Sequence, residues 1–331
     1  MSQKFEKKKK LKVLVCGFGS VGSRYARILR KGFDLDIVLF RRKHRGNSFG
    51  IPELYRWEDI RRYAPDIAFI TNPTYQHIST ALAAVSTGAH IFLEKPISHS
   101  LAGIRQLEQE CKRRRKVCYV AYTLRFVPIV QKAKQILVGR KILHGRAVCS
   151  SSLLDWRPGR QVKDCYSSYR GQGGGVILEV SHEFDLMEYL IGKADQISGW
   201  HGRLADITVD AEDTADAIMW FANGVCANIH LNFMSRKPER FFHIDFEGGF
   251  LRGDLLKHTL VFHNKGIEKV YHMPCEKDDY FGKQVKFFLK HLDDPGMMNN
   301  LSQAKGLFEK IINFRRKKYG SIADHRRSGR I

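Results

Sequence analysis

The sequence predicts two α/β folds in succession: an N-terminal doubly wound parallel sheet, then a C-terminal α+β domain with a largely antiparallel open sheet. Short apolar runs that alternate with stretches of helical spacing indicate the first. Closely spaced apolar segments joined by Asn-Gly and Gly-Gly turns indicate the second. The chain has 331 residues, 43% of them hydrophobic, which is enough for two cores. We place the domains at residues 1–126 and 127–331.

The first element is an apolar run at residues 11–16, followed by the turn GFGSVG and a helix that begins near Ser20 and Val21. Gly17 permits the tight turn, Gly19 lets the backbone approach a pyrophosphate, and Gly22 lets helix and strand pack closely. In this strand, turn and helix context, G-x-G-x-x-G predicts a Rossmann-type dinucleotide site at a helix N-terminus. The alternative is a glycine-rich turn without a ligand.

A second strand, at residues 36–40, ends in the basic run Arg41-Arg42-Lys43-His44-Arg45. NAD sites usually place Asp or Glu at this end to bind the ribose hydroxyls, whereas a 2'-phosphate calls for arginine. We expect no carboxylate to be available at that strand end. The sequence therefore favours NADP over NAD, with Arg41 and Arg42 as phosphate ligands; an exposed basic loop is the alternative.

Strands predicted at residues 67–71, 90–94 and 117–122 alternate with helices at 77–86 and 99–115. Such alternation implies parallel pairing with right-handed crossovers, and ligands bind beyond the carboxyl ends of the strands. The residues expected to line that crevice are Thr71, Asn72, Pro73, His77, Glu94 and Lys95.

The pattern changes after about residue 126. A helix at 128–138 and a strand at 140–153 precede a polar loop at 154–175, which is either a substrate lid or a disordered basic loop. The basic and aromatic residues of that loop are Arg157, Arg160, Lys163, Tyr166, Tyr169 and Arg170. Hairpins then fill residues 194–273, and two helices are expected at 280–294 and 302–318.

Five motifs together resemble the glucose-fructose oxidoreductase / inositol dehydrogenase / MocA family, over nearly the whole chain. They are the glycine turn, ITNPTYQH at 70–77, LEKP at 93–96, YTLRFVP at 122–128 and GGGVILEVSHEFDLMEYLIG at 173–192. The resemblance implies an NAD(P)-dependent oxidoreductase acting on the CH–OH group of a sugar. It also implies a homodimer or homotetramer whose subunits meet at the open face of the second sheet.

In that family the lysine of E-K-P contacts the substrate oxygen beside the nicotinamide, and a histidine opening a helix of the second domain serves as acid/base. These roles fall on Lys95 and His182. The chain departs from the family in reading Glu179-Val-Ser-His182 where D-x-x-x-H is common, and in having Thr123 where asparagine is frequent. The shorter motif resembles members from surface-polysaccharide and nonulosonic-acid pathways, which implies a sugar substrate. If the basic loop at 154–175 is a lid, it would clamp an anionic or nucleotide-linked sugar.

Hydride transfer at a carbinol carbon needs a proton carrier and a cation to stabilise the alkoxide. Either Lys95 or His182 is suited to carry the proton. Glu179 and Asp185 lie three residues on either side of His182. If the whole segment is helical, they share its face and could fix the tautomer of His182 or bind sugar hydroxyls. The expected substrate-binding residues are Lys95, Tyr122, Arg125, Arg157, Tyr169, Glu179, His182 and Asp185. No metal site is expected, because the E-x-x-H pair lacks a third ligand at recognisable spacing.

The net charge of +22 raises the question of nucleic-acid binding. The basic clusters carry no zinc-finger spacing or aromatic RNA-binding signature, so nucleic acid is an unlikely partner. No apolar run reaches the ~20 residues of a membrane span, and the N-terminal MSQKFEKKKK is not a signal peptide. We therefore expect a cytoplasmic protein. The rival from another class is a non-catalytic NAD(P)-binding sensor on the same scaffold.

Overall fold

The chain forms two units, and neither is a continuous stretch of sequence. The first takes in residues up to 94, 103–121 and 281–301, and the second takes in 95–102, 122–280 and 302 onward. The computed structural model describes residues 10–317 apart from 45, 157–160 and 206. The predicted boundary after residue 126 falls near the crossing between residues 121 and 122, and no pattern in the sequence indicated the other crossings.

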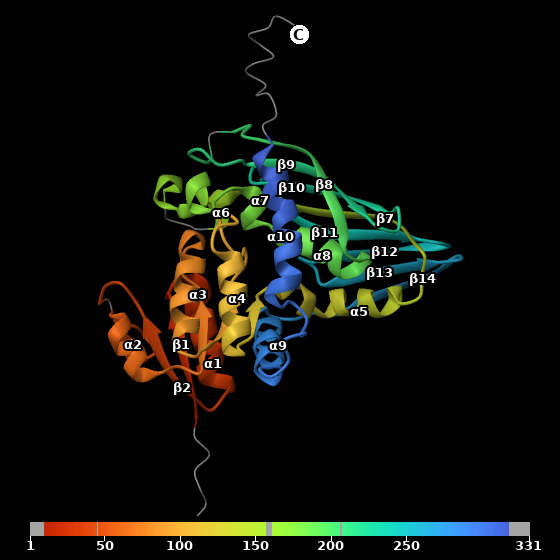
Figure 1. The fold of residues 1–331 in the computed structure, drawn as a ribbon. Coiled ribbons are helices and arrows are strands. Elements are labelled where there is room, and N and C mark those ends of the chain that lie inside the picture. Colours follow the sequence, from red (N-terminus) through yellow and green to blue (C-terminus); the bar gives the residue numbers. More distant parts are fainter. Residues whose placement is uncertain (1–9, 45, 157–160, 206, 318–331) are drawn as a thin grey trace, which may run out of the picture. The chain divides into compact units, whose positions relative to one another are not determined.

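Six parallel strands form the sheet of the first unit, in the order β3-β2-β1-β4-β5-β6. Strands β1 and β2 of this sheet are labelled in Figure 1. The strands are β1 (Leu11–Cys16), β2 (Leu35–Phe40), β3 (Glu53–Leu54), β4 (Ile67–Ile70), β5 (His90–Leu93) and β6 (Cys118–Val120). The strand order reverses between β1 and β4, which is the switch point where doubly wound sheets bind ligands. The predicted doubly wound fold is confirmed.

The helices of this unit are α1 (Ser20–Gly32), α2 (Trp57–Tyr63), α3 (His77–Ser86), α4 (Ile104–Arg114) and most of α9 (Lys277–Lys290). An aromatic core explains why α9 joins a unit so distant in sequence. The Phe69 and Phe92 rings stack with centroids 4.4 Å apart, and Phe288 of α9 packs edge-on against both. All three side chains are fully buried, so the apolar face of α9 completes this core.

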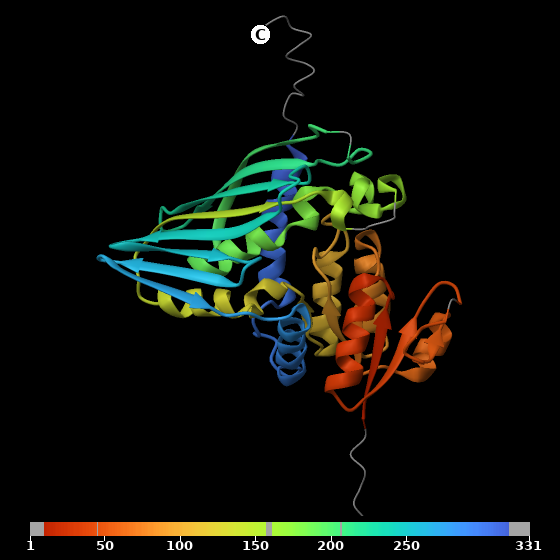
Figure 2. The ribbon, with the colours of Figure 1, turned by 180° about the vertical axis from the view of Figure 1, so that it is seen from behind.

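Eight strands form the sheet of the second unit, in the order β14-β13-β12-β11-β7-β10-β9-β8. The strands of this sheet are the yellow-green to blue arrows in Figure 2. They are β7 (Ile142–Ser150), β8 (Ala194–Gly202), β9 (Thr214–Phe221), β10 (Cys226–Asn232), β11 (Glu239–Phe246), β12 (Gly249–Asp254), β13 (Thr259–Asn264) and β14 (Ile267–His272). Every neighbouring pair is antiparallel except β7 and β10. The expected hairpin turns occur at Gly224, Gly248 and Gly266, each with a positive φ.

Helices α5 (Pro128–Leu137), α7 (Val176–Glu179) and α8 (His182–Ile191) pack on one face of this sheet. A Cβ at Gly145 of β7 would meet Ile191 and Met187 of α8, which shows how closely that helix sits. The opposite face carries the exposed side chains of Arg146, Asp216, Asn228 and Arg252.

Helices α6 (Leu153–Trp156) and α10 (Leu301–Arg316) complete the α-helices of the described residues. The segment expected to be an unstructured loop contains short 3₁₀ turns at Val162–Asp164, Tyr166–Ser168 and Arg170–Gln172. Within the described ranges, no helix is long and apolar enough to cross a membrane.

Candidate functional site

The glycine turn after β1 has the geometry that a pyrophosphate site requires. Gly17 has φ +97°, and a Cβ there would lie 2.8 Å from the Asn72 backbone. A Cβ at Gly22 would lie 2.2 Å from the Gly17 carbonyl oxygen, so only glycine fits between α1 and the turn. A Cβ at Gly19 would meet nothing within 4 Å, so open space lies beside the backbone of Gly19. The backbone therefore requires glycine at positions 17 and 22, and the approach of a pyrophosphate to Gly19 stays a prediction.

A cavity of about 680 Å³ lies at the carboxyl ends of the strands of the first unit. Its walls are Cys16, Gly17, Phe18, Phe40, Arg41, Arg42, Lys43, Trp57, Asn72, Pro73, Tyr75, Gln76, Ser79 and Thr80. The first turn of α1 contains no acidic residue, so nothing opposes an anion at that helix N-terminus. Asn72 Oδ1 is buried without a hydrogen-bond partner, while its amide nitrogen donates to Thr80 Oγ1 at 2.8 Å. These features fit a dinucleotide.

Five of the predicted cofactor residues line this cavity: Gly17, Arg41, Arg42, Asn72 and Pro73. Thr71 and His77 support its wall from behind, whereas Glu94 and Lys95 do not line it. Thr71 Oγ1 donates to the Cys16 and Gly17 carbonyl oxygens, each at 3.0 Å, and His77 Nε2 lies 2.9 Å from the Asn72 carbonyl oxygen. Gly19, Ser20, Val21 and Gly22 form the turn and the start of α1.

Glu94 is turned away from the cavity and into the core of the first unit. Glu94 Oε1 accepts a hydrogen bond from the Tyr25 hydroxyl at 2.8 Å, and Glu94 is only 8% exposed. This hydrogen bond between Glu94, which follows β5, and Tyr25 of α1 therefore holds α1 against the sheet. The sequence placed Glu94 at the correct strand end, but the direction of its side chain depends on Tyr25.

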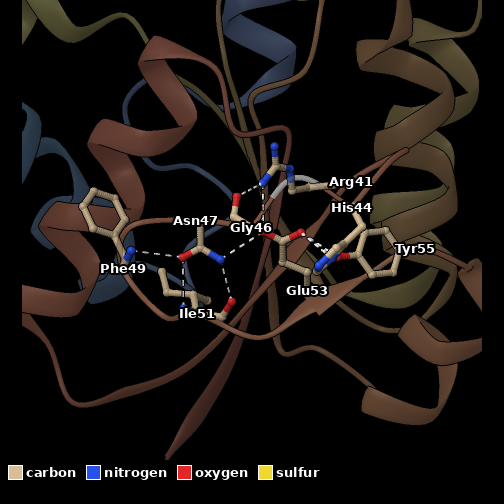
Figure 3. A network of polar contacts seen from close by, with 8 residues as sticks. All are labelled: Arg41, His44, Gly46, Asn47, Phe49, Ile51, Glu53 and Tyr55. Carbon is tan, nitrogen blue, oxygen red and sulfur yellow. Dashed lines mark hydrogen bonds and ion pairs between the residues drawn. The ribbon is translucent and has the colours of Figure 1, made fainter.

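A carboxylate does stand beside the end of β2, and the expectation that none does is wrong. Glu53 comes from β3, whose two residues pair with Leu39 and Phe40 of β2. Its Oε1 accepts a hydrogen bond from Arg41 Nη1 at 2.8 Å (Figure 3). Sequence reasoning missed it because β3 is too short to show a pattern and lies twelve residues after Arg41.

The Glu53 carboxylate is the centre of a polar network that also holds Asn47 and Tyr55 (Figure 3). Tyr55 donates to Oε2 at 2.6 Å and Asn47 Nδ2 donates to Oε1 at 3.0 Å. Burial of this carboxyl raises its pKa, but the hydrogen bonds from Tyr55, Asn47 and Arg41 outweigh burial and lower the pKa of Glu53 to about 2. Glu53 is therefore charged at neutral pH, and its charge balances that of Arg41.

Arg42 and Lys43 also line the cavity, and within the described part of the chain neither forms an ion pair. Arg41 additionally donates to the Gly46 carbonyl oxygen at 2.7 Å and lies over the Phe18 ring. Arg41 is thus held in place, while Arg42 and Lys43 keep an uncompensated positive charge at the cavity.

The catalytic candidates of the second unit meet at the short helix α7. Lys95 Nζ donates to the backbone carbonyl oxygen of Glu179 at 2.5 Å. The Glu179 carboxylate instead accepts a hydrogen bond from the Ser167 hydroxyl at 2.9 Å. The structure therefore brings together two residues that stand 84 positions apart in the chain, and it adds Ser167, which the sequence did not single out.

His182 is the first residue of α8, as the sequence predicts for the acid/base histidine. Burial, and then the charges of Lys95 and Arg240, hold the pKa of His182 well below its usual value, so the imidazole is neutral at physiological pH. Its Nδ1 is buried without a hydrogen-bond partner, and its ring packs edge-on against Tyr122 with centroids 6.0 Å apart.

Asp185 and Arg125 pair with each other. Arg125 Nε and Nη2 donate to the two carboxylate oxygens of Asp185 at 2.9 and 2.6 Å. Burial raises the pKa of Asp185, and the Arg125 guanidinium opposes the rise. The Arg125 guanidinium also lies over the Tyr189 ring. This pair fixes the segment that carries Tyr122 against helix α8.

The predicted lid residues have structural partners of their own. The Tyr169 hydroxyl donates to the Lys163 carbonyl oxygen at 2.8 Å, and Arg170 Nη1 donates to Glu212 Oε2 at 3.0 Å. Glu212 also accepts a hydrogen bond from buried Arg315 Nε at 2.7 Å. Arg157 and Arg160 lie outside the described residues.

In the Gly173-Gly174-Gly175 turn, two glycines are required by close neighbours, Gly175 by Glu212 and Gly174 by Ser167. Gly175 has φ +98°, and a Cβ there would lie 2.4 Å from Glu212 Oε1. A Cβ at Gly174 would lie 2.2 Å from the Ser167 carbonyl oxygen. The turn therefore packs directly against the residues that hold Glu179 and starts α7 at Val176. The sequence shows three glycines but not what they pack against.

Within residues 10–317, apart from the gaps named above, no three His, Cys, Asp or Glu side chains are grouped to hold a metal ion. Glu183, the acidic neighbour of His182, pairs with Arg240 at 2.7 Å. The E-x-x-H pair accordingly has no third ligand in the described residues.

Comparison with known proteins identifies the family to which this architecture belongs. Residues 11–122 match the oxidoreductase family with an NAD-binding Rossmann fold, and residues 130–252 match the GFO/IDH/MocA C-terminal domain. The chain is 22% identical to the 2,7-anhydro-N-acetylneuraminate hydratase of Mediterraneibacter gnavus, across 80% of this chain and 73% of that one. It is 26% identical to the UDP-N-acetylglucosamine 3-dehydrogenase of Acidithiobacillus ferrooxidans, across 65% and 63%.

Among solved structures, levoglucosan dehydrogenase in complex with NADH and levoglucosan has the same fold. The TM-score is 0.79 at 17% identity, and the match covers 92% of this chain and 98% of that one. The two family matches together span most of the chain and include both the glycine turn and the segment with Glu179 and His182. This chain therefore belongs to the GFO/IDH/MocA family of oxidoreductases, with an NAD-binding Rossmann fold.

Proposed function

We propose that this chain transfers a hydride between NADP, or less readily NAD, and a hydroxyl or ketone carbon of a sugar or sugar derivative. The observation that carries the proposal is the meeting of Lys95, Glu179 and His182 at one end of helix α7, in a chain that also holds a dinucleotide cavity. A protein that only binds the cofactor needs no such cluster. That cluster argues against the alternative of a non-catalytic sensor.

The bound nicotinamide supplies or accepts the hydride. His182, neutral at physiological pH, takes the hydroxyl proton during oxidation and returns it during reduction. The Lys95 ammonium stabilises the negative charge that develops on the substrate oxygen. Glu179, held through its carboxylate by Ser167, binds a neighbouring hydroxyl of the sugar and keeps it in register.

The preference for NADP rests on the charge at the end of β2. Glu53 cancels the charge of Arg41 but leaves Arg42 and Lys43 beside the cavity. Glu53 itself is buried beneath Arg41 with a side chain 5% exposed, so it is poorly placed to accept hydrogen bonds from ribose hydroxyls. Two uncompensated cations and a covered carboxylate favour a 2'-phosphate.

For the substrate, the relatives named above act on amino sugars and on an anhydrosugar. A nucleotide-linked or anionic sugar of cell-surface carbohydrate biosynthesis suits the positive charge of this chain. Tyr122, Arg125, Asp185, Tyr169 and Arg157 remain the residues proposed to shape the substrate site beside the three catalytic residues. Arg125 would act through its pair with Asp185, and Tyr169 through the loop that it braces.

We further place the protein in the cytoplasm as a homodimer or homotetramer. The exposed face of the eight-stranded sheet, which carries Arg146, Asp216, Asn228 and Trp220, is the proposed subunit contact. The functional halves are residues 1–126 for the cofactor and 127–331 for substrate and assembly. Nothing in the proposed activity requires nucleic acid.

The experiment is a screen for reduction of NADP⁺ by free, acidic and nucleotide-linked sugars, repeated with NAD⁺. The wild-type chain is compared with Lys95→Ala and His182→Gln. Turnover of at least one sugar that is lost in both variants supports the proposal. Cofactor binding without turnover of any sugar class supports the sensor instead.

A further inference from the structure

A buried ion pair lies directly behind the glycine turn that starts helix α7. Arg315 Nε donates to Glu212 Oε1 at 2.7 Å and Arg315 Nη2 donates to Glu212 Oε2 at 3.1 Å, so two nitrogens hold one carboxylate. The side chains of Arg315 and Glu212 are only 5% and 2% exposed. Because desolvation offsets much of the attraction within a buried ion pair, the main effect of this two-pronged contact is to fix geometry.

The ion pair is tied to the start of α7 by its backbone contacts. Arg315 Nη2 also donates to the carbonyl oxygen of Gly174. The carbonyl oxygen of Glu212 accepts a hydrogen bond from the amide of Val176, the first residue of α7, at 2.8 Å. Gly175 lies between these contacts, and a Cβ there would be 2.4 Å from Glu212 Oε1. A shift of the ion pair would therefore shift the first residue of α7.

Helix α7 carries such a shift to Lys95. It has only four residues, Val176–Glu179, and the amide of Glu179 donates to the carbonyl oxygen of Gly175 at 3.0 Å. At the other end of this single turn, the carbonyl oxygen of Glu179 accepts the hydrogen bond from Lys95 Nζ. Hydrogen bonds and one helical turn thus connect Arg315 to the Lys95 ammonium, and all of these residues belong to the second unit.

Helix α10 holds Arg315 in place. Four apolar side chains of α10 are at most 1% exposed: Leu307, Phe308, Ile311 and Phe314. The carbonyl oxygen of Arg315 lies in the last turn of α10, where carbonyl groups lack an amide partner inside the helix, and it accepts a hydrogen bond from Arg170 Nη2. Arg170 Nη1 donates to Glu212 Oε2 at 3.0 Å, so Arg170 joins the end of α10 to the same carboxylate.

We infer that Arg315 and Glu212 are positioning residues for the proposed reaction. They fix α7 so that the carbonyl oxygen of Glu179 holds the Lys95 ammonium at the place where negative charge develops on the substrate oxygen. The role of Lys95 in this inference rests on the proposed function. A misplacement of roughly 1 Å at a reacting centre costs about 10²-fold in rate, so loss of this support should reduce catalysis far more than cofactor binding.

The test compares the wild type with Arg315→Met and uses a readout that needs no substrate. The protein is labelled briefly with acetic anhydride, and mass spectrometry gives the acetylation rate of each lysine. Hydrogen exchange reports the amides of residues 176–180 in parallel. In Arg315→Met, Arg170 still pairs with Glu212, so the carboxylate does not become an unpaired buried charge.

We expect Lys95 to be acetylated about fivefold faster in Arg315→Met, because its ammonium is held less firmly, and the amides of Val176 and Glu179 to exchange faster by a similar factor. The exposed Lys193 should keep its rate. Arg315→Lys, which retains a donor for Glu212, should restore most of the protection. Arg316→Met, at the exposed next position of α10, is the matched control and should behave as wild type.

Kinetics on the same samples separate positioning from a general loss of structure. In Arg315→Met, kcat should fall about 10- to 10²-fold while the Kd for NADPH stays within twofold. Unchanged acetylation of Lys95 together with unchanged exchange at Val176 and Glu179 overturns the inference. If Arg315→Met does not fold, Arg170→Ala decides, because its side chain is 41% exposed and it removes one donor from Glu212. Faster acetylation of Lys95 in that variant supports the inference, and an unchanged rate overturns it.

Failure of this inference is distinct from failure of the proposed function. A wild type that turns over sugar but shows no change at Lys95 in the variants keeps the proposed function and overturns the positioning role. Faster acetylation of Lys95 in Arg315→Met, in a chain that turns over no sugar, keeps the structural support of Lys95 and overturns the proposed function.

Discussion

The Glu53 carboxylate accepts a hydrogen bond from Arg41 at 2.8 Å. Glu53 lies on β3, which pairs with β2, so a residue of β3 neutralises the first charge of the basic run that follows β2. Tyr55 and Asn47 hold the same carboxylate from two other directions. The basic run after β2 therefore contains one arginine that is fixed and neutralised, beside an arginine and a lysine that are not.

The first prediction concerns acid stability. The pKa of Glu53 is lowered in the folded protein to about 2, from an ordinary value of 4.5. A carboxyl with a lowered folded-state pKa stabilises the fold above its unfolded pKa, and that contribution disappears as the pH falls toward the folded value. Glu53→Gln should lower the free energy of unfolding by about 1 kcal/mol at pH 7, and the deficit should shrink between pH 4.5 and 2.

Urea unfolding at several pH values measures this deficit. Glu58→Gln is the matched control, because Glu58 lies on α2 of the same unit with a side chain 57% exposed. A deficit for Glu53→Gln that stays constant from pH 7 to pH 3 would contradict the assignment.

The second prediction separates the two arginines after β2. Arg42→Ala should raise the Kd for NADPH about tenfold, ~1.4 kcal/mol, and change that for NADH less than twofold. Arg41→Ala should have the smaller effect on this preference, because Glu53 already balances its charge. Arg61→Ala, on exposed helix α2, is the control. Equal losses for both cofactors in Arg42→Ala would show that Arg42 does not contact a 2'-phosphate.

The third prediction uses the glycine turn. Gly22→Ala puts a Cβ 2.2 Å from the Gly17 carbonyl oxygen and should destabilise the fold by about 1–3 kcal/mol. Gly19→Ala meets nothing within 4 Å, so it should keep the wild-type Tm while weakening NADPH binding at least tenfold. Thermal unfolding and cofactor titration are measured on the same samples. Wild-type affinity in Gly19→Ala would place the pyrophosphate elsewhere.

The fourth prediction concerns Lys95. Lys95→Ala should reduce kcat/KM about 10²- to 10³-fold, because the cation that stabilises the alkoxide is lost. NADPH affinity should stay within a few-fold, since Lys95 does not line the cavity. Lys193→Ala, an exposed lysine of the same unit, should behave as wild type. Near wild-type turnover in Lys95→Ala would remove this residue from the mechanism.

Local patterns carried much of the prediction. The glycine spacing and the alternation of strands and helices identified the parallel sheet, and glycine-containing turns identified the hairpins of the second sheet. The strand ends also identified Gly17, Arg41, Arg42, Asn72 and Pro73 as cavity residues. These features depend on neighbours within a few residues, which is why a single sequence reveals them.

What the sequence could not reveal depends on contacts between distant segments. Glu53 lies within hydrogen-bonding distance of Arg41 because β3 pairs with β2. The Glu94 side chain points into the core because the Tyr25 hydroxyl donates a hydrogen bond to it. Ser167 donates a hydrogen bond to Glu179 across a turn in which Gly175 packs against Glu212. The residues in these pairs are not separated by a spacing that indicates contact, so the pairs can be recognised only in the folded structure.

The measurement that tests the central claim most directly is a fluorescence titration of the purified chain with NADPH and with NADH at physiological salt. The account predicts saturable binding of both, with NADPH bound several-fold more tightly because Arg42 and Lys43 face the cavity without a carboxylate partner in the described residues. Absence of binding to either would contradict the dinucleotide site itself. Tighter binding of NADH would contradict the charge argument at the end of β2.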